Sequence, residues 1–136
     1  RYPGDWNTVI NNLQILTALN HEKQLDLQVL STIQVYNAFD MLNIEELMSN
    51  LRIKEKHAFT PVWNPSYLNV QCIPEQLKEK ILLRYPNPSS QVKKILDFMM
   101  YQQLNNWEQF KQFTLAVDSN RNQNVLDFVP ELKGYL

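Results

Sequence analysis

Residues 25–36 read LDLQVLSTIQVY and carry the clearest fold signal in the sequence. Its apolar side chains at positions 27, 29, 33 and 35 share one parity, whereas Gln28, Thr32 and Gln34 share the other. Successive side chains of a strand point to opposite faces, and β-branched residues favour strands. The stretch therefore predicts a strand with one apolar and one polar side.

A helix is predicted on either side of this strand. Apolar residues recur at three- and four-residue intervals over residues 6–20 and 43–51, which is typical of amphipathic helices. Asp5 is the expected N-cap of the first helix. Asn43 and Glu46 have the spacing of a capping box for the second helix.

The second half of the chain contains one more alternating stretch and three more helical patterns. Residues 67–73 alternate again and predict a second strand, whereas residues 57–63 are extended but contain Pro61, which suits a sheet edge or a strand end. The three helices are expected to begin at Pro74, at Ser89 or Ser90, and at Asn106.

The order helix, strand, helix, strand, helix indicates an α/β fold of βα units with parallel strands. Strands of a doubly wound sheet are usually apolar on both sides, but both strands predicted here have a polar side. Two interpretations stay open on periodicity alone. The sheet has one face in water, or it belongs to an open barrel whose interior binds a polar cofactor.

Composition excludes several classes of function. A net charge of −1 gives no general attraction for nucleic acid or anionic lipid. No apolar run approaches the roughly 18 residues that span a bilayer, and the 2 glycines are not placed to form a phosphate-binding loop. The single cysteine, Cys72, cannot form an internal disulfide or hold a metal cluster by itself, and it favours a reducing, cytoplasmic location.

Polar residues at the strand ends are the candidate binding groups, because α/β folds gather ligand-binding residues at the carboxyl ends of their strands. Hydroxyl and amide groups can bind a polar ligand without bringing charge into a pocket. Alternatively, Asn37 merely begins the loop to the next helix. The same two interpretations apply throughout the candidate set, which comprises Thr32, Gln34, Asn37, Asn64, Tyr67, Asn69 and Gln71.

Several motifs carry a family resemblance. The first is STIQVYNAF at residues 31–39, followed by Leu42 and by EEL at residues 45–47. The others are NPSYL at 64–68, IPEQLK at 73–78, VDSNR at 117–121 and DFVPEL at 127–132. In this order the motifs resemble radical S-adenosylmethionine enzymes of the twitch type, which lack an auxiliary-cluster domain.

The resemblance implies the carboxy-terminal part of a partial (β/α)₆ TIM-like barrel over residues 1–85, followed by two or three additional helices over residues 86–136. Enzymes of this family use S-adenosylmethionine and a [4Fe–4S] cluster. Their cluster motif, C-x₃-C-x₂-C, is absent from this sequence. The chain is therefore expected to be a fragment that supplies part of the pocket and is inactive alone.

The resemblance also assigns expected contacts and partners. The cofactor would be bound by Arg1, Thr32, Gln34 and Asn37, and the substrate by Asn64, Tyr67, Asn69 and Gln71. The main partner would be the missing amino-terminal half of the barrel, and exposed strand edges predict self-association. A competing hypothesis is a non-catalytic interaction module whose helical face around Trp107, Phe110 and Phe113 binds a partner protein.

Overall fold

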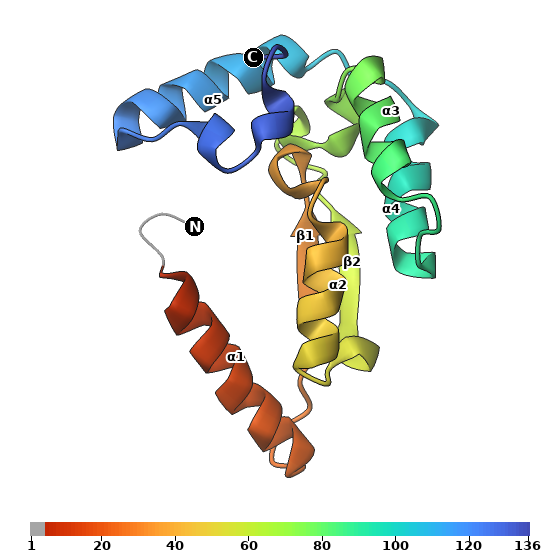
Figure 1. The fold of residues 1–136 in the computed structure, drawn as a ribbon, viewed down its shortest axis with the longest axis vertical. Coiled ribbons are helices and arrows are strands. Elements are labelled where there is room, and N and C mark those ends of the chain that lie inside the picture. The colour runs from red at the N-terminus through yellow and green to blue at the C-terminus, as the bar shows by residue number, and fades with distance from the viewer. Residues whose placement is uncertain (1–4) are drawn as a thin grey trace. The chain divides into compact units, whose positions relative to one another are not determined.

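A computed structural model describes residues 5–136 of the chain (Figure 1). Over these residues it contains a two-stranded parallel sheet, in which β1 (Val29–Ile33) pairs with β2 (His57–Pro61). The mixed α/β fold with parallel strands is therefore confirmed. The helices are α1 (Trp6–His21), α2 (Met41–Asn50), α3 (Glu75–Arg84), α4 (Ser90–Tyr101) and α5 (Trp107–Arg121).

The chain divides into two compact units. The first combines Arg1–Ser31 with Leu42–Ala58, and the second combines Thr32–Met41 with Phe59–Leu136. Both strands begin in the first unit and end in the second. The predicted domain boundary after residue 85 falls between α3 and α4, which belong to the same unit, and it stays a prediction.

The second strand is not where the alternation predicted it. Residues 67–73 do not form a strand but lie in two short 3₁₀ turns, Ser66–Leu68 and Val70–Cys72. The Asn69 side chain accepts a hydrogen bond from the Gln71 backbone amide at 2.9 Å, a local contact that competes with sheet pairing. The partner of β1 is instead the extended stretch that ends at Pro61.

Asp5 and Ser89 cap their helices through side-chain hydrogen bonds, as predicted. Asp5 accepts hydrogen bonds from the backbone amides of the first turn of α1, and Ser89 Oγ accepts one from the Val92 amide at 3.2 Å. The capping box at Asn43 is wrong, because α2 already begins at Met41. The Met41 amide donates to the hydroxyl of Tyr85 at 3.1 Å, so the residue that caps the end of α3 satisfies the start of this helix.

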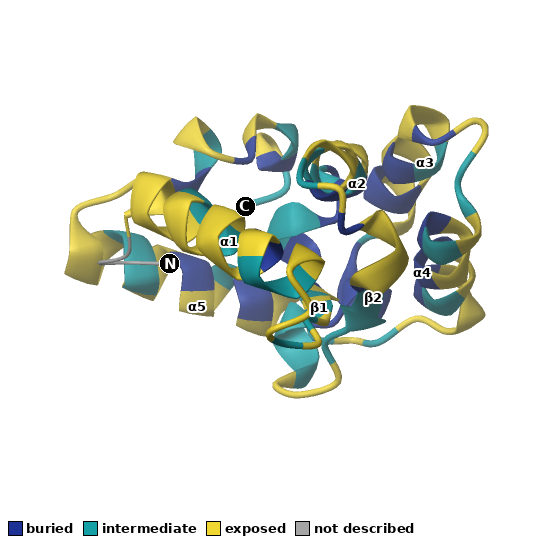
Figure 2. Cartoon of the chain, turned by 90° about the horizontal axis from the view of Figure 1, so that it is seen from below, coloured by how far each residue is buried: buried dark blue, intermediate teal, exposed yellow. Residues whose placement is uncertain are grey.

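The second unit contains most of the apolar core (Figure 2). Its helices bury one apolar stripe each, and the tail that follows α5 buries Val125, Val129 and Leu132. The fully buried apolar residues of this unit include Leu77 and Ile81 of α3, Val92 and Met99 of α4, and Phe110 of α5.

Helix α1 is confirmed as a helix, but its apolar stripe is largely exposed. Most of the helix is exposed (Figure 2). Thr17 is its buried residue, whereas Trp6 is 63% exposed and Val9 is 42% exposed. Over residues 5–136 we find no helix that combines the length and the apolar character required to traverse a bilayer.

Candidate functional site

Thr32 lies near the end of β1, and Gln34 and Asn37 lie in the turn that directly follows it. Gln34 and Asn37 form a reciprocal capping box, and the Gln34 backbone amide donates to Asn37 Oδ1 at 2.8 Å. The Asn37 side-chain amide donates to the Thr32 carbonyl oxygen at 3.0 Å. The structure thus brings the three predicted cofactor residues together, and it gives Asn37 a local role in shaping the turn.

Their exposure decides which groups can meet a ligand. Thr32 is exposed, whereas Gln34 and Asn37 are half-buried. A solvent-facing hydroxyl beside side-chain amides suits the ribose and amino-acid groups of S-adenosylmethionine in chemical type. The charged member of the expected set, Arg1, lies outside the described residues.

The predicted substrate residues separate into two pairs. Asn64 is exposed and Tyr67 is half-buried, and both lie early in the β2–α3 loop (residues 62–74). Asn69 and Gln71 are buried, with exposed fractions of 2% and 1%. The first pair is therefore accessible to a ligand, and the second is enclosed in the packing of the second unit.

Gln71 is fully occupied by structural contacts. Its side-chain nitrogen donates to the Phe98 carbonyl oxygen at 2.8 Å, and its side-chain oxygen accepts from Gln102 at 3.0 Å. Its backbone oxygen accepts from the Leu104 amide at 3.1 Å. Of the candidate binding residues, Thr32 is therefore exposed, whereas Gln71 is buried against α4.

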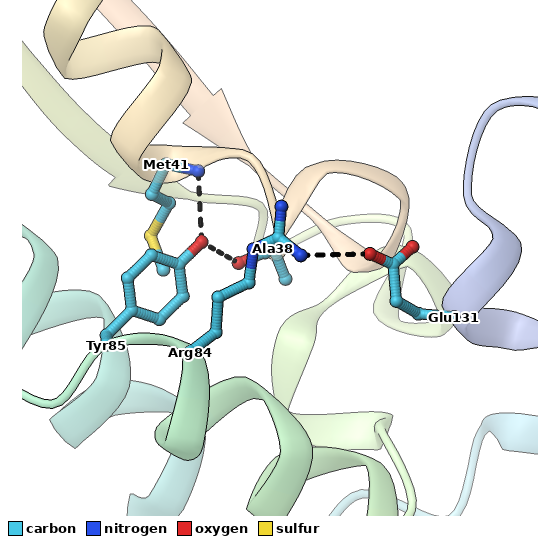
Figure 3. A network of polar contacts seen from close by, with 5 residues as sticks. All are labelled: Ala38, Met41, Arg84, Tyr85 and Glu131. Atoms are coloured by element: carbon cyan, nitrogen blue, oxygen red, sulfur yellow. Dashed lines mark hydrogen bonds and ion pairs between the residues drawn. The ribbon is translucent and has the colours of Figure 1, made fainter.

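Tyr85 fixes the β1–α2 loop (residues 34–40) that carries the cofactor candidates (Figure 3). Its hydroxyl donates to the Ala38 carbonyl oxygen at 2.8 Å and accepts from the Met41 amide at 3.1 Å. Burial raises the pKa of Tyr85 to about 12, so the hydroxyl stays protonated and can donate. Beside it, Arg84 pairs with Glu131 at 3.2 Å. No signal in the sequence pairs position 85 with this loop.

His57 is a buried histidine of the first unit, with only 5% of its surface exposed. Its Nε2 lies 2.9 Å from the Ser31 hydroxyl oxygen on the neighbouring strand. Burial lowers the pKa of His57, and the nearby Glu45 carboxylate on α2 partly opposes that effect. At neutral pH, His57 and Ser31 therefore form an uncharged contact between the two strands.

Acidification is expected to destabilise the chain through His57. The unfolded residue titrates near 6.5 and the folded residue below that value, so the unfolded state binds more protons between the two. The contribution of His57 is fully present above pH 6.5 and is lost as the pH falls through the lower folded pKa. The melting temperature of the chain at pH 5 and at pH 7.5 measures this loss of stability. His57→Gln should reduce the difference in melting temperature between pH 5 and pH 7.5. The control His21→Gln, at an exposed position, should leave that difference unchanged.

Cys72 is a buried thiol, as its position on the apolar side of the pattern predicted. Burial raises its pKa to about 11, and its Sγ donates to the Tyr67 carbonyl oxygen at 3.4 Å. A thiol in this state is neither a nucleophile nor a cluster ligand. Over residues 5–136, no group of three histidine, cysteine, aspartate or glutamate residues is placed to hold a metal ion.

A cavity of about 320 Å³ opens beside Cys72, but it contains none of the predicted ligand residues. Lys78 is 2% exposed, and its ammonium donates to Gln103 Oε1 at 2.7 Å and to the Gln102 carbonyl oxygen at 3.4 Å. Gln102 is the C-cap of α4, where a positive charge stabilises the helix dipole. Lys78 therefore closes the end of α4, a role that the sequence did not reveal.

The aromatic residues of the competing hypothesis make contacts inside the second unit. Phe110 is 0% exposed, and Trp107 stacks on it with ring centroids 4.7 Å apart. Phe113 packs against Tyr67 at 4.9 Å. Phe110 is therefore core, whereas Phe113 remains 36% exposed, and binding of a partner protein stays a prediction.

The candidate site thus consists of the β1–α2 loop with Thr32, Gln34 and Asn37, and of the early β2–α3 loop with Asn64 and Tyr67. Both loops belong to the second unit. Comparisons of the chain with protein-family models, with curated proteins and with solved structures gave no match.

Proposed function

We propose that this chain is the carboxy-terminal part of a radical S-adenosylmethionine enzyme, in which its two strands belong to a partial (β/α)₆ barrel. The β1–α2 loop contacts the cofactor and the early β2–α3 loop contacts the substrate. The chain by itself is catalytically incomplete.

One observation carries the proposal. β1 and β2 are parallel and are connected through α2, so the two loops that follow them leave the same edge of the sheet. This edge is where (β/α) barrels collect their catalytic and binding groups. The motif resemblance of residues 31–39 and 64–68 falls on these same two loops.

The contacts of the two loops suggest which residues bind the cofactor and which bind the substrate. When bound, the [4Fe–4S] cluster supplies the electron that splits S-adenosylmethionine into methionine and a 5′-deoxyadenosyl radical, and the protein binds and orients. Thr32 and Gln34 offer a hydroxyl and an amide toward the cofactor, and Asn37 holds their turn together. Asn64 and Tyr67 face the substrate. Asn69 and Gln71 support the loop from behind.

The test is anaerobic iron–sulfide reconstitution of the longer protein that contains this chain, followed by measurement of 5′-deoxyadenosine. We expect release of 5′-deoxyadenosine that depends on dithionite and on the upstream cysteine motif. The isolated chain, treated identically, should release none. An upstream segment without three cysteines in the C-x₃-C-x₂-C spacing, or a reconstituted longer protein without 5′-deoxyadenosine release, would rule the proposal out.

We also expect the isolated chain to self-associate. A two-stranded sheet leaves an unpaired edge on each strand, and unpaired edges are sites of association. Sedimentation velocity over a concentration series should show a sedimentation coefficient that rises with concentration. A constant monomeric value would contradict the expectation, and the longer protein serves as the control because its upstream half would cover the edge of β1.

A further inference from the structure

We infer that helix α5 positions the two loops of the proposed site against each other, with Tyr36, Thr114 and Phe113 as positioning residues. The inference rests on the proposed function for the identity of the ligands. The contacts that attach both loops to α5 all lie within the second unit and do not depend on the identity of the ligands.

The β1–α2 loop is attached to α5 through Tyr36, which lies between Gln34 and Asn37 in the turn. The Tyr36 hydroxyl and the Thr114 hydroxyl are 2.7 Å apart and share a hydrogen bond. The Tyr36 ring also packs against Phe110 with centroids 5.1 Å apart. Thr114 is 1% exposed, so this contact is shielded from competing water.

The β2–α3 loop is attached to the same helix through Tyr67. Its ring packs against Phe113 with centroids 4.9 Å apart, and the 3₁₀ turn that contains Tyr67 contacts α5. Aromatic pairs at this separation stabilise a contact beyond the area that they bury. Tyr67 is itself a predicted substrate residue, so its ring position bears directly on the proposed pocket.

The three α5 positions belong to one helical turn. Residues three and four apart lie on the same side of a helix, so Phe110, Phe113 and Thr114 present one surface to both loops. The helix is fixed in turn, because Phe110 is fully buried and Trp107 Nε1 donates to the Tyr135 carbonyl oxygen at 3.0 Å. A rigid rod that contacts both loops sets the distance between them, although 78 residues separate Tyr36 from Thr114.

Amide hydrogen exchange of the chain tests the anchoring without any cofactor. The double variant Tyr36→Phe/Thr114→Val removes both hydroxyls, so neither is left buried without a partner. We expect the amides of Gln34 and Asn37 to exchange roughly fivefold to tenfold faster, with Leu68 and Asn69 unchanged. Phe113→Leu should produce the reverse pattern.

Leu115→Ala is the matched control on the same helix, because Leu115 is 59% exposed. It should change neither loop, and the amides of α4 report any loss of global stability. The inference would be overturned if the double variant accelerated hydrogen exchange equally in both loops and in α4. It would also be overturned if exchange at Gln34 and Asn37 did not accelerate in that variant.

A second measurement connects the anchoring to the ligand. In the longer protein, the double variant should weaken S-adenosylmethionine binding about fivefold in equilibrium dialysis, whereas Phe113→Leu should leave it unchanged. Equal losses in both variants would indicate a purely structural role and contradict the inference. If the wild-type longer protein binds no S-adenosylmethionine, the proposed function fails, and the exchange data alone decide whether α5 anchors the loops.

Discussion

Replacing Phe110 by alanine is expected to lower the free energy of unfolding by about 3–5 kcal/mol, because it deletes a fully buried ring and leaves a cavity. The Phe110 ring lies against two others, Tyr36 at 5.1 Å and Trp107 at 4.7 Å, so the neighbours cannot close the gap without moving the β1–α2 loop. Urea unfolding followed by circular dichroism measures the change.

The matched control is the same substitution at a solvated position. Phe128 is 70% exposed, and Phe128→Ala should change the free energy of unfolding by no more than about 0.5 kcal/mol. Similar losses in the two variants would show that Phe110 is not the packing centre of the second unit.

Replacing Tyr85 by phenylalanine is expected to cost about 2–4 kcal/mol in the free energy of unfolding. The variant keeps the ring but leaves the Ala38 carbonyl oxygen and the Met41 amide without their hydrogen-bond partner (Figure 3). Each buried polar group left unpaired costs roughly 1–3 kcal/mol. Because the Met41 amide begins α2, exchange of this amide should accelerate more than exchange of amides in α4.

Tyr101→Phe provides the control, since Tyr101 is 83% exposed and its hydroxyl is solvated. It should be neutral to within about 0.5 kcal/mol. An equally small effect at Tyr85 would mean that water replaces the hydroxyl, and the loop would then need another anchor.

Local patterns located the helices well. Apolar periodicity and the caps Asp5 and Ser89 placed α1 and α4, and the prolines near residue 86 ended α3 as expected. These signals work because a helix end is satisfied by side chains a few residues away. Asn43 failed as a cap because Tyr85, 44 positions from Met41, supplies the contact that starts α2.

Alternation was a weaker guide for the strands. Residues 25–36 alternate apart from Leu30 and Ser31, but pairing covers only Val29–Ile33. Residues 67–73 alternate and form no strand. In the latter stretch Val70, Gln71 and Cys72 are all buried, so its polar positions do not face a separate side. Whether an alternating stretch becomes a strand depends on a partner, and a single sequence does not show partners.

Local patterns were sufficient to predict the α/β class and the order of helices and strands, because each depends on neighbours within a few positions. The folded structure was needed to show that Val35–Asn37 form a 3₁₀ turn instead of continuing the strand, and that β2 is His57–Pro61. It was also needed to show that Gln71 and Lys78 are buried and that α5 contacts both loops of the proposed site. Those outcomes depend on side chains that meet from distant parts of the chain, where burial and hydrogen bonding outweigh local propensity.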